Sequence, residues 1–358
     1  MSVVIVGGGF GALEVALAIK AADRDIPVRV VATETSVLYR PWLIHLPAGN
    51  REPPMIPFAQ LLARAGVEVT ADRAASSDLA RRVITLQSGA ELPYEQLVVA
   101  SGAVSDRDRV PGSRAGALFP CDEADAAELA RRIDGGAIGV AIVFGWERPG
   151  PGLEYAAWIA AHRSGVRVTA IDGDGTLERR CGPKATAWLR QLFESRGARL
   201  LEGRVESIGG GQVSLANGES VAAEVIAVAT PLRGGTDWLP AELLDPSARI
   251  RVDDAMAVAP GVFAIGDVVI VPDGYRLSPA LRSIQATSRG VAGNVMRALR
   301  EEGPLPVLKP GTSDSMLPDL GGTAMLVRDR RLVTRGRLPL FLRSLGERRY
   351  LRSRGATY

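Results

Sequence analysis

Cysteine and histidine are scarce in this chain of 358 residues, which contains two of each. Cys121 and Cys181 lie 60 positions apart and form no CxxC pair, and His45 and His162 are equally isolated. Zinc and iron–sulfur sites need several such ligands at short spacing, so the sequence predicts no metal site. Two unpaired thiols also favour a reducing cytoplasm over a scaffold held by disulfides.

Long apolar runs and lysines are missing as well. No run approaches the roughly 18–20 apolar residues that cross a bilayer, and we expect no secretory leader because the first predicted strand begins at Val3. The chain has only three lysines, and ten of its arginines lie in residues 328–354 against two acids. The rest of the chain is therefore acidic, and we expect it to bind no nucleic acid.

What the sequence does contain is a repeated order of apolar strand, glycine turn and helix, in residues 2–22 and again in 138–165. Strands that alternate with helices predict parallel sheets. We therefore expect an α/β protein with two Rossmann-like three-layer dinucleotide-binding domains, small antiparallel additions and a C-terminal appendage. The expected division is a first domain in 1–107 and 247–305, a second domain in 108–246, and a linker with a basic interface segment in 306–358.

The first glycine turn, in VVIVGGGFGALE, has the pattern G-x-G-x-x-G/A at Gly7, Gly9 and Ala12. Such a turn brings the backbone close to a pyrophosphate and places the phosphates at the N-terminus of a helix, where N–H groups and the helix dipole favour negative charge. The acid that usually binds the ribose would fall at Ala32, which cannot accept a hydrogen bond. Either Glu34 reaches back to the ribose, or backbone groups and Thr33 hold it.

Four segments extend this pattern in a fixed order: GGGFGALE, VRVVATETSVLYRPWLIHLPAG, YEQLVVASGA and GVFAIGDVV. Over roughly residues 3–300 they resemble the FAD-dependent pyridine nucleotide–disulfide oxidoreductase superfamily, with its glutathione-reductase-like fold. Within it, the chain is most similar to the branch of sulfide:quinone reductases, flavocytochrome c sulfide dehydrogenases and type II NADH dehydrogenases.

The resemblance implies that FAD is the cofactor. Pro41, preceded by Arg40, would lie near the isoalloxazine, and Asp267 would bind the ribityl and pyrophosphate part. Arg282 would lie in the helix that packs against the flavin and would favour its reduced, anionic form. The complete predicted set for FAD is Gly7, Gly9, Phe10, Gly11, Ala12, Glu34, Arg40, Pro41, Ala100, Ser101, Gly102, Gly266, Asp267 and Arg282.

The second glycine turn, FGWERPGPGLE, departs from the pattern of family members that use NADH. Its two prolines remove N–H groups that would bind a pyrophosphate, and Trp146 and Glu147 add bulk and negative charge. Arg148 stands where sulfide:quinone reductases have a redox cysteine, so we expect no sulfide oxidation through a disulfide. Asp172, 20 residues beyond Gly152, remains a candidate for binding a nicotinamide dinucleotide's ribose, or is a turn residue at the end of a strand.

Three residues are candidates for catalytic roles, each with a structural alternative. Glu154 would relay a proton to the flavin or a quinone oxygen, or is a carboxylate favoured by the helix dipole. Arg148 would pair with an anionic substrate or with reduced flavin, or forms a surface ion pair. Cys121 matches an additional cysteine of some sulfide:quinone reductases, or is a small buried residue. His45, near the expected flavin edge, reads as a core histidine, and adjacent Trp42 stacks on substrate or fills core.

The basic C-terminal segment carries a helical stripe of Leu338, Phe341, Leu342 and Leu345. Arginines surround it, at positions 337, 343, 348 and 349. Such a helix suits an anionic membrane surface, and quinone reductases of the superfamily use C-terminal helices in this way. Because Pro339 and Gly346 interrupt the stripe, we expect it to pack on the chain's own core or on a twin subunit.

Taken together, these features predict a cytoplasmic nucleotide-binding flavoprotein, with membrane association as an alternative. We expect an FAD oxidoreductase that passes electrons from a small-molecule donor to a quinone-like or other small aromatic acceptor. One alternative is an NAD(P)H-dependent flavin reductase or dehydrogenase with an atypical second turn. Another is a flavin-binding redox sensor without catalytic activity. The C-terminal segment would provide peripheral membrane contact or homodimerisation.

Overall fold

The computed structural model describes residues 2–49, 52–146, 148–272, 281–303, 305–308 and 315–357, with the side chains of 281–283 outside the description. The chain divides into two compact units. The first comprises Met1–Val37, Met55–Val104 and Arg233–Ser313, and the second Leu38–Pro54, Ser105–Leu232 and Asp314–Tyr358. The boundaries expected at residues 107, 246 and 305 stay a prediction.

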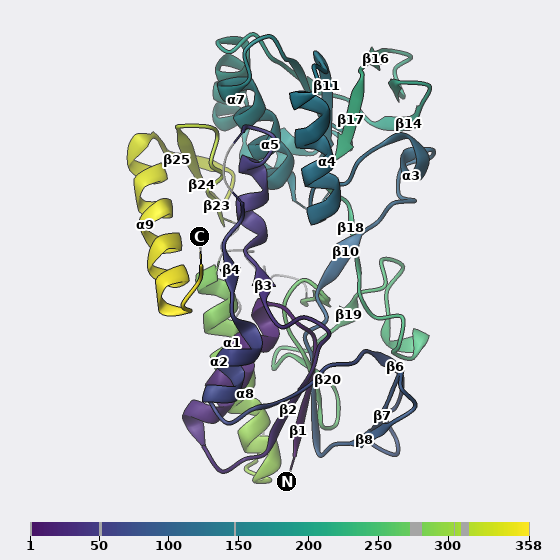
Figure 1. Cartoon of the computed structure of the whole chain (residues 1–358), viewed down its shortest axis with the longest axis vertical. Helices are drawn as coiled ribbons and strands as arrows, with labels where there is room; N and C mark the ends of the chain where they lie inside the picture. The colour runs from purple at the N-terminus through teal and green to yellow at the C-terminus, as the bar shows by residue number, and fades with distance from the viewer. Residues whose placement is uncertain are drawn as a thin grey trace. The chain divides into compact units, whose positions relative to one another are not determined.

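The first unit is built on a six-stranded sheet in the order β20-β21-β9-β1-β2-β5. All neighbours are parallel except the β20–β21 pair. The central strand β1 is buried along its whole length, as expected for a parallel strand covered on both faces. Helices α1 and α8 pack along one another in this unit (Figure 1). The main elements are β1 (Val3–Val6), α1 (Phe10–Ala22), β2 (Val28–Val31), α2 (Phe58–Arg64), β5 (Glu68–Thr70), β9 (Gln96–Val99), β20 (Ala257–Ala259), β21 (Val262–Ala264) and α8 (Leu281–Leu299).

Short elements complete the first unit. An antiparallel three-stranded sheet, β6–β7–β8, confirms the small addition expected between the two glycine turns. Three further strands, β3, β10 and β18, lie where the chain passes from one unit to the other. The bounds of these elements are β3 (Val37–Leu38), β4 (Met55–Ile56), β6 (Ala74–Asp78), β7 (Val83–Leu86), β8 (Glu91–Pro93), β10 (Ala103–Ser105), β18 (Leu232–Gly234), η2 (Ala241–Leu243), β19 (Ile250–Arg251) and β22 (Val269–Ile270).

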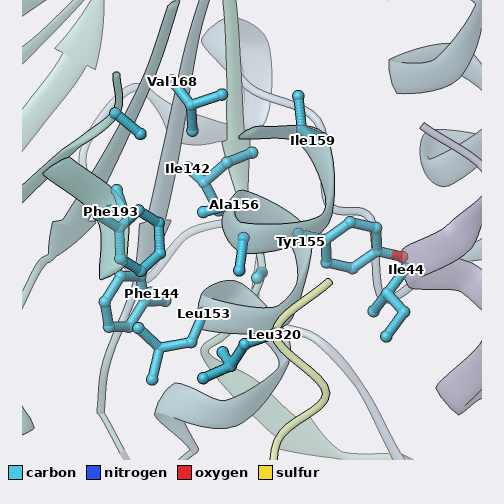
Figure 2. Close-up of a cluster of buried hydrophobic side chains, with 14 of the residues drawn as sticks. Ile44, Ile142, Phe144, Leu153, Tyr155, Ala156, Ile159, Val168, Phe193 and Leu320 are labelled. Atoms are coloured by element: carbon cyan, nitrogen blue, oxygen red, sulfur yellow. The ribbon is translucent and has the colours of Figure 1, made fainter. Parts of the chain in front are cut away.

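The second unit has a four-stranded parallel sheet in the order β13-β12-β11-β17. Helix α5 follows the central strand β11, and its apolar side chains form the core of the unit. Figure 2 shows Ile142, Phe144, Leu153, Ala156 and Ile159 gathered around this helix. The elements are η1 (Arg40–His45), α3 (Ser113–Gly116), α4 (Glu123–Asp134), β11 (Gly139–Phe144), α5 (Pro149–His162), β12 (Arg167–Asp172), α6 (Leu177–Cys181), α7 (Pro183–Glu194), β13 (Arg199–Glu202), β14 (Val205–Gly209), β15 (Gln212–Leu215), β16 (Ser220–Ala222) and β17 (Val225–Val228).

The C-terminal appendage belongs to this second unit and consists of a three-stranded antiparallel sheet and a helix. Its elements are β23 (Ser315–Met316), β24 (Ala324–Arg328), β25 (Arg331–Gly336) and α9 (Arg337–Ser353). Helix α9 runs through Gly346 without a break, and Pro339 lies in its first turn, where a missing N–H costs no helical hydrogen bond. The expected interruption of the helix is therefore wrong.

The apolar stripe of α9 does not pack on the chain's own core, so that alternative is wrong, while packing on a twin subunit stays a prediction. Leu338, Phe341, Leu342 and Leu345 are 53–65% exposed. The buried side chains of the helix, Pro339, Tyr350 and Leu351, point away from this stripe. The stripe is thus an outward-facing apolar surface in this chain.

Candidate functional site

The first glycine turn joins β1 to α1 and has the geometry of a phosphate-binding turn. Gly7 has a φ of +142°, and a Cβ there would stand closer than 3.0 Å to the carbonyl oxygen of Ala100, so only glycine fits. Gly9 is the N-cap of α1, and no protein atom lies within 4 Å of the position its Cβ would take. Ala12 is fully buried. The turn therefore presents an open backbone surface at the positive end of a helix.

Two other predicted segments meet this turn at the same edge of the sheet. The carboxyl ends of β9 and β21 lie beside that of β1, because Val99 pairs with both Val6 and Ala264. Ala100, Ser101 and Gly102 follow β9, and Gly266 and Asp267 follow β21 by two residues. In open α/β sheets, ligands bind at this edge, where the strand order reverses on either side of the first strand.

The side chains and glycines of these segments fit a bound dinucleotide. The hydroxyl oxygen of Ser101 is buried and has no hydrogen-bond partner within the chain. Gly102 and Gly266 have φ values of +72° and +86°, and nothing lies within 4 Å of either Cβ position. An unpartnered buried hydroxyl next to open glycine backbone is the kind of feature that a ligand's polar groups satisfy. The residues present therefore fit the adenosine diphosphate half of FAD.

Glu34 lies over the first turn rather than away from it. Its Oε2 atom is 2.5 Å from the position that a Cβ on Gly8 would take, and the side chain is exposed. Ala32, at the usual position of the ribose acid, is buried. Of the two alternatives for ribose binding, this geometry favours the one in which Glu34 reaches back.

The remaining residues predicted for FAD are not all brought to this edge within the first unit. Phe10 and Gly11 begin α1, and a Cβ added at Gly11 would lie 3.5 Å from the side chain of Ile265. Arg40 and Pro41 lie, both exposed, at the start of η1, which belongs to the second unit. Arg282 falls in α8, but its side chain lies outside the described residues.

The second glycine turn has a similar backbone but different surroundings. Gly145 has a φ of +130°, and its Cβ position lies closer than 3.0 Å to Oδ1 of both Asp172 and Asp174. The next residue, Trp146, takes a φ of +54°, which is unfavourable for a bulky side chain. Gly152 lies so close to Phe144 that a Cβ added at position 152 would overlap the Cβ of Phe144. Two carboxylates thus stand against the first glycine of this turn, whose counterpart at the first turn, Gly7, faces the carbonyl of Ala100.

Asp172 is fully buried and forms a hydrogen bond with the protein's own backbone. Its Oδ2 accepts a hydrogen bond of 2.7 Å from the N–H of Leu177, which begins α6. Its Oδ1 is buried without a partner. Burial raises the pKa of Asp172 to about 7, and the neighbouring Asp174 adds to the rise. These contacts favour the structural alternative, in which Asp172 is a strand-end residue that caps a helix, over ribose binding.

The three candidate catalytic residues hold different partners. Arg148 is the N-cap of α5, and its N–H donates to the carbonyl of Gly145 at 3.2 Å. The thiol of Cys121 donates to the carbonyl of Ala229. Glu154 is buried, forms an ion pair with Arg343 of α9, and accepts a hydrogen bond of 2.8 Å from the N–H of Asp319. The catalytic roles of these residues stay predictions.

Sequence reasoning missed the ion cluster around Arg343. Arg343 was assigned to the surface around the apolar stripe, yet its side chain is only 14% exposed. A signal was present: Arg343 and Glu347 form an i, i+4 pair that shares the helix face of Tyr350 and Leu351, opposite the stripe. Helical periodicity can separate the two faces of α9, but it does not show that the less apolar face is the one that points inward.

A second missed feature is a row of aromatic rings in the second unit. His45 packs edge-on against Trp42 and Trp158, with ring centroids 4.7 and 4.2 Å apart. His162 stacks on Trp158, with ring centroids 4.3 Å apart. Both histidines of the chain are therefore ring-packing residues, and among the described residues no three His, Cys, Asp or Glu side chains group as a metal site.

Comparisons with known proteins agree with this geometry. The family model described as pyridine nucleotide-disulphide oxidoreductase matches residues 1–292. The ferredoxin–NAD(+) reductase component of the biphenyl dioxygenase system of Paraburkholderia xenovorans (strain LB400) is 29% identical over 284 residues, which cover 76% of this chain and 68% of the relative. An NADH dehydrogenase-like protein of Mycobacterium tuberculosis (strain ATCC 25618 / H37Rv) is 27% identical over 290 residues, with 74% and 72% covered.

Solved structures show the same fold. The sulfide:quinone oxidoreductase of the hyperthermophilic bacterium Aquifex aeolicus superposes with a TM-score of 0.84 at 20% identity, over 99% of this chain and 91% of that one. The α/β fold with Rossmann-like parallel sheets and the resemblance to this superfamily are thus confirmed. Within the described part of the chain, no helix has the length and apolar character needed to cross a membrane.

Proposed function

Because the chain belongs to the pyridine nucleotide-disulphide oxidoreductase family, whose members are oxidoreductases that use FAD and NAD(P)H, we propose that it passes electrons through FAD to a quinone-like or other small aromatic acceptor, without a redox-active disulfide. The observation that carries this proposal is the contrast between the two glycine turns. The first presents open backbone for a dinucleotide, while the second faces two carboxylates.

When bound, FAD supplies the redox chemistry, and the chain's own residues bind it and control access to it. The N-terminus of α1 would hold the phosphates, Glu34 the ribose and the hydroxyl of Ser101 a polar group of the cofactor. Neither cysteine is placed for disulfide chemistry: Cys181 is fully buried, and Cys121 donates to a backbone carbonyl. Electron transfer through a pair of thiols is therefore not part of the proposal.

A second candidate function is an NAD(P)H-dependent reductase. It is favoured by the intact β11–α5–β12 arrangement, in which Gly152 keeps the close contact of helix and strand that such domains share. The carboxylates of Asp172 and Asp174 beside Gly145 argue against this second function, since they would repel a pyrophosphate bound at that glycine. If a nicotinamide dinucleotide binds this unit, we expect its phosphates to avoid the Gly145 turn.

Anaerobic stopped-flow reduction separates the two candidates. Flavin that is bleached by dithionite but not by NADH or NADPH, and that is reoxidised rapidly by a soluble short-chain quinone, supports the proposal. Bleaching by NADH within the turnover time supports the reductase. Reoxidation by a ferredoxin or a rubredoxin but not by a quinone would contradict the proposed acceptor class.

We further propose that the outward face of α9 contacts an anionic lipid surface, where a quinone acceptor would be found. Its four exposed apolar residues are bordered by exposed arginines, among them Arg337, Arg348 and Arg349. A basic helix with an apolar face binds anionic interfaces in two ways: its apolar side chains are buried in the interface, and its arginines are attracted to the anionic headgroups. The same arginines oppose self-association, because a two-fold contact of this face would bring like charges together.

Sedimentation with vesicles tests this surface. We expect binding to vesicles of phosphatidylglycerol and phosphatidylcholine, weaker binding to phosphatidylcholine alone, and loss of binding in the double variant Phe341→Ser, Leu342→Ser. Ile138→Ser, at another exposed apolar residue, is the matched control and should bind as the wild type does. Equal binding of all variants, or a dimer that only the double variant loses, would contradict the proposal. The cytoplasmic location expected from the sequence stays a prediction.

A further inference from the structure

Helix α9 lies against the second unit with charged side chains on its inward face and its apolar stripe outward. The four residues of the stripe are more than half exposed. On the inward face, the side chains of Arg343 and Glu347 are only 14% and 23% exposed. An amphipathic helix normally turns its apolar stripe inward, because burial removes apolar area from water. Another contact must therefore fix which face of α9 points inward.

Arg343 makes the contacts that can fix this face. It forms an ion pair with Glu154 of α5, in the same unit, and donates from Nη1 to the carbonyl of Leu317 at 2.7 Å. Its Nε donates to Oε1 of Glu347, one turn further along α9, at 3.0 Å. The planar guanidinium thus reaches α5, the segment before β24 and its own helix at once.

The surface beneath α9 is held in place by the rest of the second unit. Glu154 is buried, and the carboxylate oxygen that meets Arg343 also accepts the N–H of Asp319 at 2.8 Å. Asp319 is buried as well, and its Oδ1 accepts the N–H of Gly321 at 3.1 Å. Arg196, which follows α7, donates to the carbonyl of Gly321 at 3.0 Å. Two carboxylates are therefore fixed beneath the helix.

These two carboxylates need a cation opposite them. Burial raises the pKa of both Glu154 and Asp319, and the positive charge of Arg343 opposes the rise at each. If α9 turned its stripe inward, leucine and phenylalanine side chains would cover the carboxylates and Arg343 would be exposed to water. A buried ion pair often adds little net stability, but an arrangement that leaves one of its charges buried and unpaired is strongly disfavoured. Such a pair can therefore select one packing over another.

We propose that the buried Arg343–Glu154 pair sets which face α9 presents to the outside: it holds the charged face inward and so keeps the apolar stripe available to an anionic lipid surface. Arg343 is then a positioning residue for that surface. The biological use of this orientation rests on the lipid contact proposed above, while the orientation itself is a property of the second unit alone.

The test removes both charges together, so that neither is left buried and unpaired. The double variant Arg343→Gln, Glu154→Gln keeps hydrogen-bonding groups at both positions. The matched control is Arg190→Gln, Glu202→Gln, which removes an ion pair of 2.8 Å between α7 and β13 in the same unit. Hydroxyl-radical footprinting of the full chain, read by peptide mass spectrometry, measures the exposure of individual aromatic side chains.

Phe341 and Tyr350 report the two faces of α9, since they are 61% and 6% exposed. In the double variant we expect α9 to roll and bury its stripe. Because oxidation follows the exposed fraction, the oxidation of Phe341 should fall at least about threefold and that of Tyr350 should rise by a similar factor. Both rates should stay at the wild-type level in the control and in Arg343→Lys, which keeps a cation in this position.

Two results would overturn the inference. Unchanged oxidation of both aromatic residues in the double variant, whatever its melting temperature, would mean that other contacts orient α9. A rise at Tyr350 without a fall at Phe341 would mean that the ion pair only tethers the helix. Adding Leu342→Ser and Leu345→Ser to the double variant removes the gain from burying the stripe and should protect Tyr350 again; continued exposure of Tyr350 there would contradict the proposed cause of the roll.

The footprinting result is independent of the lipid contact. If the double variant does not fold, Glu154→Gln alone removes one charge at constant length, and the same outcomes apply to it. If the wild type fails to bind vesicles, the proposed lipid contact is wrong, while footprinting still decides whether the pair orients α9. If the wild type binds, we expect the double variant to lose vesicle binding together with the exposure of Phe341.

Discussion

The two glycine turns of this chain have the same backbone plan and opposite surroundings. Each follows the central strand of a parallel sheet, begins with a glycine at φ above +125°, and leads into a helix packed on that strand. At the first turn, the space above Gly9 is clear of protein, and one carboxylate, that of Glu34, lies over Gly8. At the second, the carboxylates of Asp172 and Asp174 converge on Gly145. A shared fold therefore does not give both turns the same ligand, because the side chains around each turn decide what it binds.

The largest effect that would sharpen this comparison is expected from Gly9→Ala. A methyl group there meets no protein atom, so folding should be unaffected, but it would enter the space assigned to the phosphates. We expect the affinity of the apoprotein for FAD to fall by about 100-fold, equivalent to about 2.7 kcal/mol. Isothermal titration of apoprotein with FAD measures it, with thermal unfolding as the check on folding. An unchanged affinity would mean that Gly9 does not face the cofactor.

The matching change at the second turn is Gly152→Ala, with the opposite outcome. Its Cβ would overlap Phe144, so the cost falls on packing within the second unit. We expect the free energy of unfolding to drop by about 2 kcal/mol, with the FAD affinity of the folded protein unchanged. Gly150→Ala is the control, since its nearest neighbour, the sulfur of Met316, is at an ordinary 3.9 Å. Loss of FAD without loss of stability would break the comparison.

A smaller effect is expected from Asp172→Asn, and it depends on pH. The folded-state pKa of about 7 lies above the ordinary value of 3.8, so the native state keeps a proton that the unfolded chain releases. Stability from this group is present at low pH and is lost as the pH rises from about 4 to 7. The variant keeps the oxygen that caps α6 but cannot ionise. It should be more stable than the wild type at pH 8, where the buried carboxylate of the wild type is ionised, and denaturant titrations at pH 5 and pH 8 measure the difference.

The control for this prediction is Asp174→Asn, which removes the neighbouring charge and leaves Asp172 able to ionise. We expect it to reduce the pH dependence only in part, because burial is the larger cause of the raised pKa. If Asp172→Asn is as sensitive to pH as the wild type, Asp172 is not the group that titrates.

Much of the first turn could be predicted from sequence because its requirements are local. Gly7 needs a positive φ and Ala12 a small volume, and both are encoded within six residues. The α/β fold followed from the same local order of strand, turn and helix. The reach of Glu34 back over Gly8 remained open, because two loops at a sheet edge decide it.

The second turn and the C-terminal helix were harder because distant residues define them. Asp172 has the spacing of a ribose-binding acid, but its burial and its bond to Leu177 depend on how β12 and α6 pack. Arg343 differs from the exposed arginines of α9 only in what lies opposite it, namely Glu154, 189 positions earlier in the chain. Periodicity shows which residues share a helix face, but tertiary packing decides which residues that face contacts.

The central claim is that the Gly7–Ala12 turn holds FAD, and the absorbance spectrum of the purified protein, followed by titration of apoprotein with FAD, tests it most directly. We predict a yellow protein with the two absorption bands of oxidised flavin, and saturation of the apoprotein at one FAD per chain. A colourless preparation that neither binds added FAD nor gains thermal stability from it would contradict the assignment of the turn and the electron transfer proposed from it.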